Sequence, residues 1–278
     1  MKHPLASCLL ALAPTLCLAQ EIPDALIGVW ATPTCAAPAD TLVLYQNFYL
    51  WLGEEETALT GLTASAAQPD GWTRLQESDG YPNFFQIQPD GRLREAFLPE
   101  SADKAAAPSQ DWQTADYESC ANALPPGKVL LHGEPVALLR VISNAQGLCE
   151  TDRQACANQL FAGIDVSGDG NLSVAEIARL FRVAGYVAAV GQDTAANNDD
   201  LAGLLAAGLP LGPLLASAIV NSFDYNNDSV VSLAELSQDR GTLIEPFEPK
   251  TSSALNSRLN QMREALKPLG QLLDHFGK

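Results

Sequence analysis

The first half of the chain consists of short apolar and aromatic segments separated by polar turns. Aspartate–glycine pairs, which are typical of tight hairpin turns, recur at intervals of nine and eleven residues, at Asp70-Gly71, Asp79-Gly80 and Asp90-Gly91. Apolar runs lie between or beside them, at residues 26–30, 41–52, 72–75, 84–87 and 93–97. This spacing predicts an antiparallel β meander over about residues 27–140, closing as a small barrel or sandwich.

The end of this β-rich region is expected to contain one more hairpin. Residues 129–131 and 136–141 are apolar and flank Gly133-Glu134, which would form the turn. The alanine-rich stretch at residues 101–109 has no apolar period, so we expect a loop there. The pattern therefore places a β-rich domain at residues 20–145.

From Cys149 onward the apolar positions follow a helical period, which predicts an all-α domain at residues 146–278 and an α+β fold class overall. A capping cluster at residues 197–200 precedes a long uncharged run at residues 201–220. The run is long enough to span a bilayer, but Pro210 and Pro213 interrupt it. We therefore expect no transmembrane span in the mature chain.

The last segment, residues 252–276, carries an apolar stripe at intervals of three and four positions. The stripe comprises Leu255, Leu259, Met262, Leu266, Leu269, Leu273 and Phe276. This periodicity predicts an amphipathic helix that is broken or bent at Pro268.

The chain is strongly acidic. Its 278 residues include 33 acidic and 16 basic side chains, so the formal net charge is −17. This charge repels phosphates, which argues against nucleic acid or an anionic membrane surface as a partner, and it favours attraction of cations. The length is sufficient for about two domains, each with its own core.

The first nineteen residues have the layout of a cleavable secretory signal. Lys2 and His3 precede an apolar stretch at residues 5–18, and small residues end it before Gln20. We expect a mature chain that begins near Gln20 and is exported, to the periplasm or the medium. A lipoprotein acylation box ending at Cys8 is the alternative, but it leaves no room for an apolar core ahead of the cysteine.

Export changes the interpretation of the cysteines. Four remain in the mature chain, and an even number in an oxidising compartment indicates disulfides. Of the three connectivities, we expect Cys35 with Cys120 and Cys149 with Cys156; buried free thiols are the alternative. A cysteine metal site is less favoured because no Cys-x-x-Cys pair is present.

Two twelve-residue segments carry oxygen-bearing side chains at matching positions, and we call residues 165–176 the first loop and residues 224–235 the second loop. Both have Asp at positions one and five, Ser or Asn at position three, Ser at position nine and Glu at position twelve. This pattern resembles a pair of EF-hands. Ca²⁺ takes six to eight oxygens, which such a loop supplies from side chains one, three and five, the carbonyl of seven and both oxygens of twelve.

The resemblance implies two bound calcium ions and a ligand set in each loop. The ligands of the first loop would be Asp165, Ser167, Asp169, the carbonyl of Asn171 and Glu176. The ligands of the second loop would be Asp224, Asn226, Asp228, the carbonyl of Val230 and Glu235. Ser173 and Ser232 at position nine would act through a water. The amphipathic helix expected at residues 252–276 would pack in the core. Alternatively, the resemblance allows it to lie in the groove that an EF-hand pair opens toward a target helix.

Residues around the loops repeat as well. Leu172 and Val231 at position eight are expected to pair across a short antiparallel bridge. Ser173 with Glu176, and Ser232 with Glu235, have the spacing of capping boxes that begin the exit helices.

The second loop departs from the family pattern, because Ser229 replaces the glycine that stands at position six of the first loop as Gly170. A residue other than glycine costs about 1 kcal/mol at positive φ. Gly241 also follows soon after the second loop, so its exit helix is expected to be short, and the two loops start 59 positions apart, at 165 and 224. We therefore expect a weaker second site.

The β-rich domain carries one weak resemblance. Gly28-Val-Trp30 is similar to the Gly-x-Trp that opens the first strand of lipocalins, whose barrel holds an apolar ligand. Only three residues carry the resemblance, and a core tryptophan beside a glycine has the same pattern, so we transfer no ligand from that family.

These features favour an exported calcium-binding protein in which Ca²⁺ stabilises the structure and an interaction surface for a protein partner. The alternatives are a calcium-responsive sensor and a small-ligand-binding barrel regulated by Ca²⁺. We expect no enzyme, because the sequence has no nucleophile elbow, zinc triad or phosphate loop. His132 beside Glu134 would form only a solvated hairpin turn.

Overall fold

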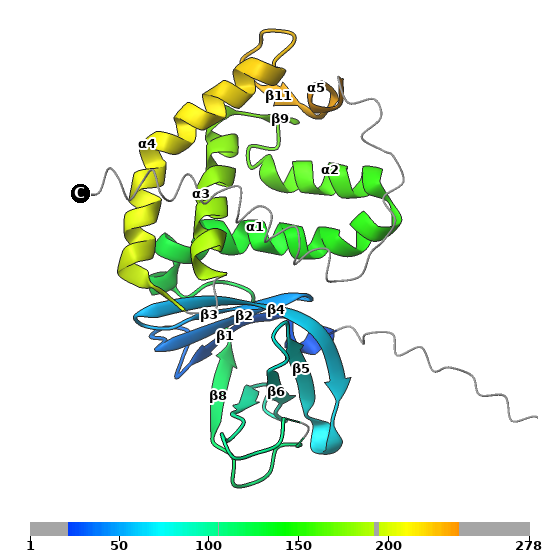
Figure 1. The fold of residues 1–278 in the computed structure, drawn as a ribbon, viewed down its shortest axis with the longest axis vertical. Coiled ribbons are helices and arrows are strands. Elements are labelled where there is room, and N and C mark those ends of the chain that lie inside the picture. Colours follow the sequence, from blue (N-terminus) through cyan, green and yellow to red (C-terminus); the bar gives the residue numbers. More distant parts are fainter. Residues whose placement is uncertain (1–21, 105, 192–194, 239–278) are drawn as a thin grey trace, which may run out of the picture.

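The N-terminal part of the chain forms a closed antiparallel barrel of eight strands in the computed structural model, which describes residues 22–104, 106–191 and 195–238 (Figure 1). The strands are β1 (Gly28–Thr32), β2 (Asp40–Leu44), β3 (Phe48–Leu52), β4 (Glu56–Ala67), β5 (Thr73–Glu77), β6 (Pro82–Ile87), β7 (Leu93–Ala96) and β8 (Thr114–Ser119). Each strand pairs with the next, and β8 returns to β1. The predicted meander that closes as a small barrel is confirmed.

Alternation of side chains along the strands produces two apolar layers. One cluster fills the barrel and includes Trp30, Leu42, Leu44, Leu75, Phe85 and Leu93, each at most 5% exposed. The three aspartate–glycine pairs lie at hairpin connections, where Gly71, Gly80 and Gly91 have φ values of 80°, 90° and 83°. These pairs thus form the turns that the sequence predicts.

Several strand predictions need correction. The apolar run at residues 41–52 is two strands, because the chain turns between β2 and β3. Strands β4 and β8 were not predicted, since Thr and Ala dominate the first and polar residues the second. The predicted hairpin at residues 129–141 is wrong: it lies inside a helix, α1 (Pro126–Thr151), which begins with proline at its first turn and contains Pro135. The helical part therefore starts at Pro126.

Four more helices and three short strands follow within the described residues. They are α2 (Arg153–Ile164), β9 (Asn171–Leu172), α3 (Val174–Val190), β10 (Ala196–Asn197), α4 (Asn198–Phe223), β11 (Val231–Ser232) and α5 (Leu233–Gln238). Figure 1 shows the helices stacked over the β1–β4 half of the barrel. The outer faces of β1–β3 share an apolar cluster with residues of α1, α3 and α4, including Val43, Leu50, Val136, Tyr186 and Leu201. This cluster joins the two parts of the fold.

Polar groups also form hydrogen bonds at this junction, one between α1 and α3 and one between the barrel and α1. The His132 Nδ1 and the Tyr186 hydroxyl share a hydrogen bond of 2.8 Å, and the Tyr45 hydroxyl donates to the Val136 carbonyl at 2.9 Å. Burial, with a smaller contribution from Lys128, lowers the pKa of His132 to about 4. The buried imidazole is therefore neutral at pH 7.

Helix α4 is fixed to the barrel at its first residue. The Asn198 side-chain amide donates to the Glu54 carbonyl at 3.1 Å and accepts from the Thr57 hydroxyl at 2.7 Å. Asn197 caps the helix by accepting from the Asp199 N–H, so the predicted capping cluster is confirmed. Among the described helices, α4 alone is long and apolar enough to cross a membrane, and one such helix is weak evidence of a span.

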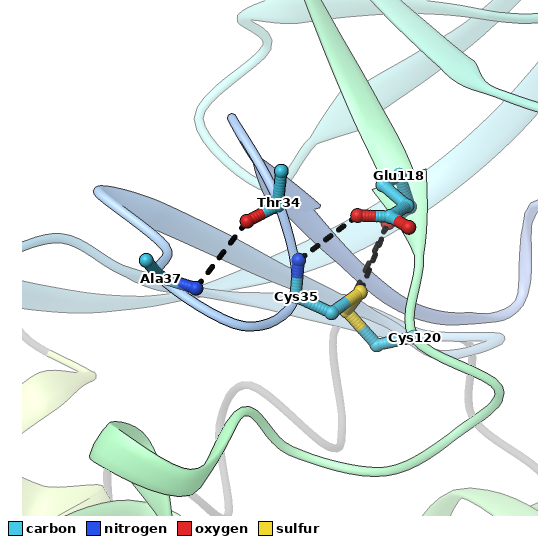
Figure 2. Close-up of a disulfide and its surroundings, with 5 residues drawn as sticks. All are labelled: Thr34, Cys35, Ala37, Glu118 and Cys120. Atoms are coloured by element: carbon cyan, nitrogen blue, oxygen red, sulfur yellow. Dashed lines mark hydrogen bonds between the residues drawn. A yellow bond between two sulfur atoms is a disulfide. The ribbon is translucent and has the colours of Figure 1, made fainter.

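Both predicted disulfides are present. Cys35 and Cys120, 85 residues apart, join the β1–β2 connection to the end of β8, with Cα atoms 5.6 Å apart (Figure 2). The Cys35 N–H also donates to the Glu118 carboxylate at 3.0 Å. Cys149 and Cys156 join the end of α1 to the start of α2. Disulfides are compatible with export; the predicted signal at residues 1–19 and the segment at residues 252–276 lie outside the described residues.

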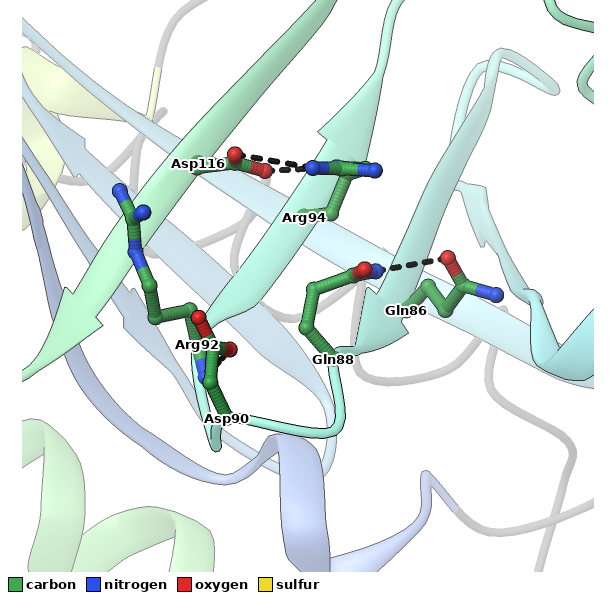
Figure 3. A network of polar contacts seen from close by, with 6 residues as sticks. All are labelled: Gln86, Gln88, Asp90, Arg92, Arg94 and Asp116. Atoms are coloured by element: carbon green, nitrogen blue, oxygen red, sulfur yellow. Dashed lines mark hydrogen bonds and ion pairs between the residues drawn. The ribbon is translucent and has the colours of Figure 1, made fainter.

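Within the described residues, the outer face of β6–β8 carries no helix, and its solvent-exposed part is polar (Figures 1 and 3). Arg94 on β7 forms a bidentate ion pair with Asp116 on β8, at 2.6 and 3.0 Å. Beside it the Gln88 amide donates to the Gln86 side chain at 2.7 Å. This half of the barrel therefore faces solvent, and the opposite half holds the helical part.

Candidate metal-binding loops

The first loop connects α2 to α3 and wraps around the carboxylate of Asp165. That carboxylate accepts hydrogen bonds from the N–H groups of Gly168 at 2.7 Å and Gly170 at 2.8 Å. Both glycines have positive φ, 71° and 82°, which lets the backbone point its N–H groups inward. Slight burial opposes ionisation of Asp165, but the N–H donors of Gly170 and Gly168 prevail and lower its pKa.

Glu176 at position twelve reaches back across the first loop. Its Oε1 accepts from the Ser167 N–H at 2.9 Å, and its Oε2 accepts from the Ser173 N–H at 2.8 Å. Ser173 accepts in return from the Glu176 N–H, so the predicted capping box is present. Burial opposes ionisation, but these donors outweigh it and lower the pKa of Glu176 to about 2. A charged carboxylate thus spans positions three and nine.

The second loop repeats this arrangement between α4 and α5. Asp224 accepts from the N–H groups of Asp228 at 3.0 Å and Ser229 at 2.8 Å. Glu235 accepts from the Ser232 N–H at 2.8 Å and, with its other oxygen, from the Tyr225 N–H at 3.1 Å. The Ser232 donors, followed by weaker ones, lower the pKa of Glu235.

The two loops face one another, as the sequence predicts. Val231 pairs with Leu172 in an antiparallel bridge between β11 and β9 (Figure 1), and these side chains are 0% and 4% exposed. Below the bridge lies one apolar cluster that includes Phe161, Ile177 and Val220, from α2, α3 and α4. A change in either loop is therefore transmitted to the same core.

The remaining predicted ligands lie inside their own loops. The Ser167 hydroxyl donates to Asp165 at 3.1 Å, and Asp169 accepts from the Asn171 N–H at 2.8 Å. In the second loop the Asn226 amide donates to Asp228 at 2.9 Å, and Asp228 accepts from the Val230 N–H at 3.1 Å. Side chains at positions one, three, five and twelve are thus gathered in each loop.

The donors in both loops are oxygens of carboxylates, hydroxyls, amides and carbonyls. Such a set fits a hard cation and lacks the nitrogen and sulfur ligands that zinc prefers. In the described part of the chain the loop carboxylates face backbone N–H groups, and no group of three or more His, Cys, Asp or Glu side chains is placed to hold a metal ion. Ligation by these residues therefore requires each carboxylate to exchange N–H partners for the cation.

Two features of this region were not predicted. Asn227 at position four of the second loop has φ 63°, a conformation that asparagine tolerates better than most residues, which was the available signal. The attachment of Asn198 to the barrel had no sequence signal, because its partners lie over 140 positions away. His132 and Glu134 do not pair: Glu134 accepts from Arg182 at 2.6 Å. No protein-family model, curated protein or solved structure matches the chain.

Proposed function

We propose that the protein binds two calcium ions, more tightly in the first loop than in the second, as an EF-hand-like pair. One observation carries the proposal: two segments far apart in sequence adopt the same closed turn. In both, position six has positive φ, position eight joins a shared bridge, and the carboxylate of position twelve reaches back to the N–H of position three. Two unrelated loops have no reason to share all three features.

The ligands we assign are those predicted from the sequence. Asp165 and Glu176 provide the charged oxygens of the first loop and belong to the end of α2 and the first turn of α3. Asp224 and Glu235 do the same for α4 and α5. A bound divalent cation neutralises carboxylates that otherwise repel one another, and it links the two helices on either side of its loop.

In this proposal calcium acts as a structural clamp. An ion that binds only the folded chain stabilises it by about 2.7 kcal/mol at a hundredfold excess over its dissociation constant. Extracellular modules often bind calcium at about 10⁻⁴ to 10⁻³ M, and the two disulfides are compatible with export.

The barrel contributes an interaction surface to this proposal, not a ligand cavity. Its interior is filled by side chains such as Trp30 and Phe85, which are 5% and 0% exposed. The exposed part of its outer face at β6–β8 is polar. We therefore assign the interaction with a protein partner to that outer face.

Calorimetric titration with Ca²⁺ tests the proposal. We expect two binding events for the wild-type protein, loss of the tighter one in Glu176→Gln and loss of the weaker one in Glu235→Gln. Glu100→Gln, at an exposed carboxylate outside the loops, is the matched control and retains both. Absence of binding in the wild-type protein, or equal binding in all four proteins, contradicts the proposal.

A further inference from the structure

The outward face of α4 is apolar and exposed. No charged residue occurs at positions 201–223, and the most apolar stretch of the helix is only 17% buried. Four leucines on this helix are 40–69% exposed: Leu209, Leu211, Leu214 and Leu215. Helices of folded proteins that face water carry charged residues on that side, so this face has the composition of a covered surface.

Only one side of α4 is packed within the described residues. Gly212 lies so close to α3 that a Cβ there would come within 3.2 Å of the Ala178 carbonyl. Ala216 and Val220 on the same side are buried. The exposed leucines therefore need a different partner.

We propose that the C-terminal segment, residues 252–276, packs along the outward face of α4 as an antiparallel amphipathic helix. With a bend at Pro268, its 25 residues would extend about 38 Å as a helix, close to the length of the 26-residue α4. Its stripe of leucine, methionine and phenylalanine side chains recurs at helical spacing. The two apolar faces therefore match in length and in composition.

The chain connection permits this arrangement. The described part of helix α5 ends at Gln238. This helix begins at the end of the second loop, and the second loop begins where α4 ends. Residues 239–251 form a connection of thirteen residues, which spans at most about 43 Å when extended. The connection therefore allows the segment to start near the C-terminal end of α4 and to run back along it.

The charge of the C-terminal segment favours it as the partner of α4 over a second copy of the chain or an anionic membrane. Residues 252–278 contain four basic and two acidic side chains, a formal net charge of +2, whereas residues 1–251 contain 12 basic and 31 acidic side chains, a net charge of −19. A basic segment is attracted to its own acidic chain. A second copy of the chain and an anionic membrane are both repelled by the acidic remainder.

Helix α4 is also ill suited to insertion in a bilayer. Its first residue is hydrogen-bonded to the barrel through Asn198, and its last turn leads into the second loop at Asp224. Insertion would break both connections. The proposed contact leaves them intact and does not depend on calcium binding.

Limited proteolysis of the full-length mature protein tests the contact. Trypsin sites at Arg258 and Arg263 lie within the segment, and those at Arg179 and Arg182 in α3 report on the integrity of the fold. We compare three double variants: Leu211→Ser with Leu214→Ser on α4, Leu259→Ser with Leu266→Ser on the segment, and Val129→Ser with Leu130→Ser on α1. The last pair, 50% and 97% exposed, is the matched control.

We expect the wild-type segment to be protected and both the α4 and the segment variants to be cleaved there about tenfold faster, with α3 still resistant. The control should match the wild type. Cleavage of the wild-type segment as fast as in the variants overturns the proposal. Protection that rises with protein concentration identifies a second copy instead, and protection only with phosphatidylglycerol vesicles identifies a membrane. If the α4 variant is also cleaved faster in α3, its fold is disturbed. The comparison of the segment variant with the wild type then tests the proposal, because that variant leaves α4 unchanged.

Discussion

The two loops share one backbone conformation but differ in the residues that adopt it. Positions four and six are Gly168 and Gly170 in the first loop and Asn227 and Ser229 in the second, and all four have positive φ. A residue other than glycine costs about 1 kcal/mol in that region. The second loop therefore adopts the turn against the preference of its own residues, whereas the first loop adopts it freely.

The surroundings explain how the second loop keeps this turn. Val231 pairs with Leu172, and the capping bonds between Ser232 and Glu235 match those of the first loop. Helix α4 enters the second loop from a fixed position on the barrel. The bridge and the helices thus impose the conformation on the second loop. The two loops hold similar oxygen donors, but the second does so at a higher cost in backbone strain.

The largest expected effect is on stability in calcium. For each protein we compare thermal unfolding in excess Ca²⁺ and in chelator. At a hundredfold excess over the dissociation constant of the first loop, its ion contributes about 2.7 kcal/mol, or about 5–10 °C, and Glu176→Gln should remove this gain. Glu235→Gln should remove about 1 kcal/mol less, since its site is weaker. A larger loss in Glu235→Gln would reverse our ranking of the loops.

A second test concerns the first loop in the absence of calcium. The pKa of Glu176 is about 2 in the folded protein and ordinarily about 4.5, so the unfolded chain binds the proton more tightly. The stabilisation from this carboxylate is complete above pH 4.5 and is lost as pH falls toward 2. Because the loop borders solvent, we expect about 1–2 kcal/mol.

Chemical unfolding of protein stripped of calcium beforehand, between pH 6 and pH 2.5, measures this effect as the difference between wild type and Glu176→Gln. His132, with a pKa of about 4, titrates in both proteins and cancels. A pH dependence that is identical in the two proteins would show that the Glu176 hydrogen bonds do not stabilise the calcium-free fold.

Features set by neighbours in sequence were predictable, and features set by distant contacts were not. The loop turns, the capping boxes and the aspartate–glycine hairpins depend on side chains a few positions apart. The disulfides followed from the small number of cysteines. By contrast, residues 129–141 are apolar with a central glycine, a pattern that fits a hairpin or a buried helix, and only packing of Val136 on the barrel decides.

The candidate site shows the same limit. All ten predicted ligand positions lie in two matching loops, because spacing within twelve residues is a local property. Helix α4 connects the barrel to the second loop, and this connection depends on the hydrogen bonds of Asn198 with Glu54 and Thr57. Nothing in the local sequence identifies those partners, so the link from the two loops to the barrel required the structure.

The smallest expected effect comes from exchanging the residues at position six. Ser229→Gly should tighten the second site about fivefold and Gly170→Ser should weaken the first by the same factor, corresponding to about 1 kcal/mol each. The reason is that a strained loop opens more readily without the ion, so calcium must close it again, and glycine reduces that cost. Calorimetric titration of both variants measures the affinities. If the exchanges shift the melting temperatures but leave both affinities unchanged, the strain is equal with and without calcium, and the loops differ in affinity for another reason.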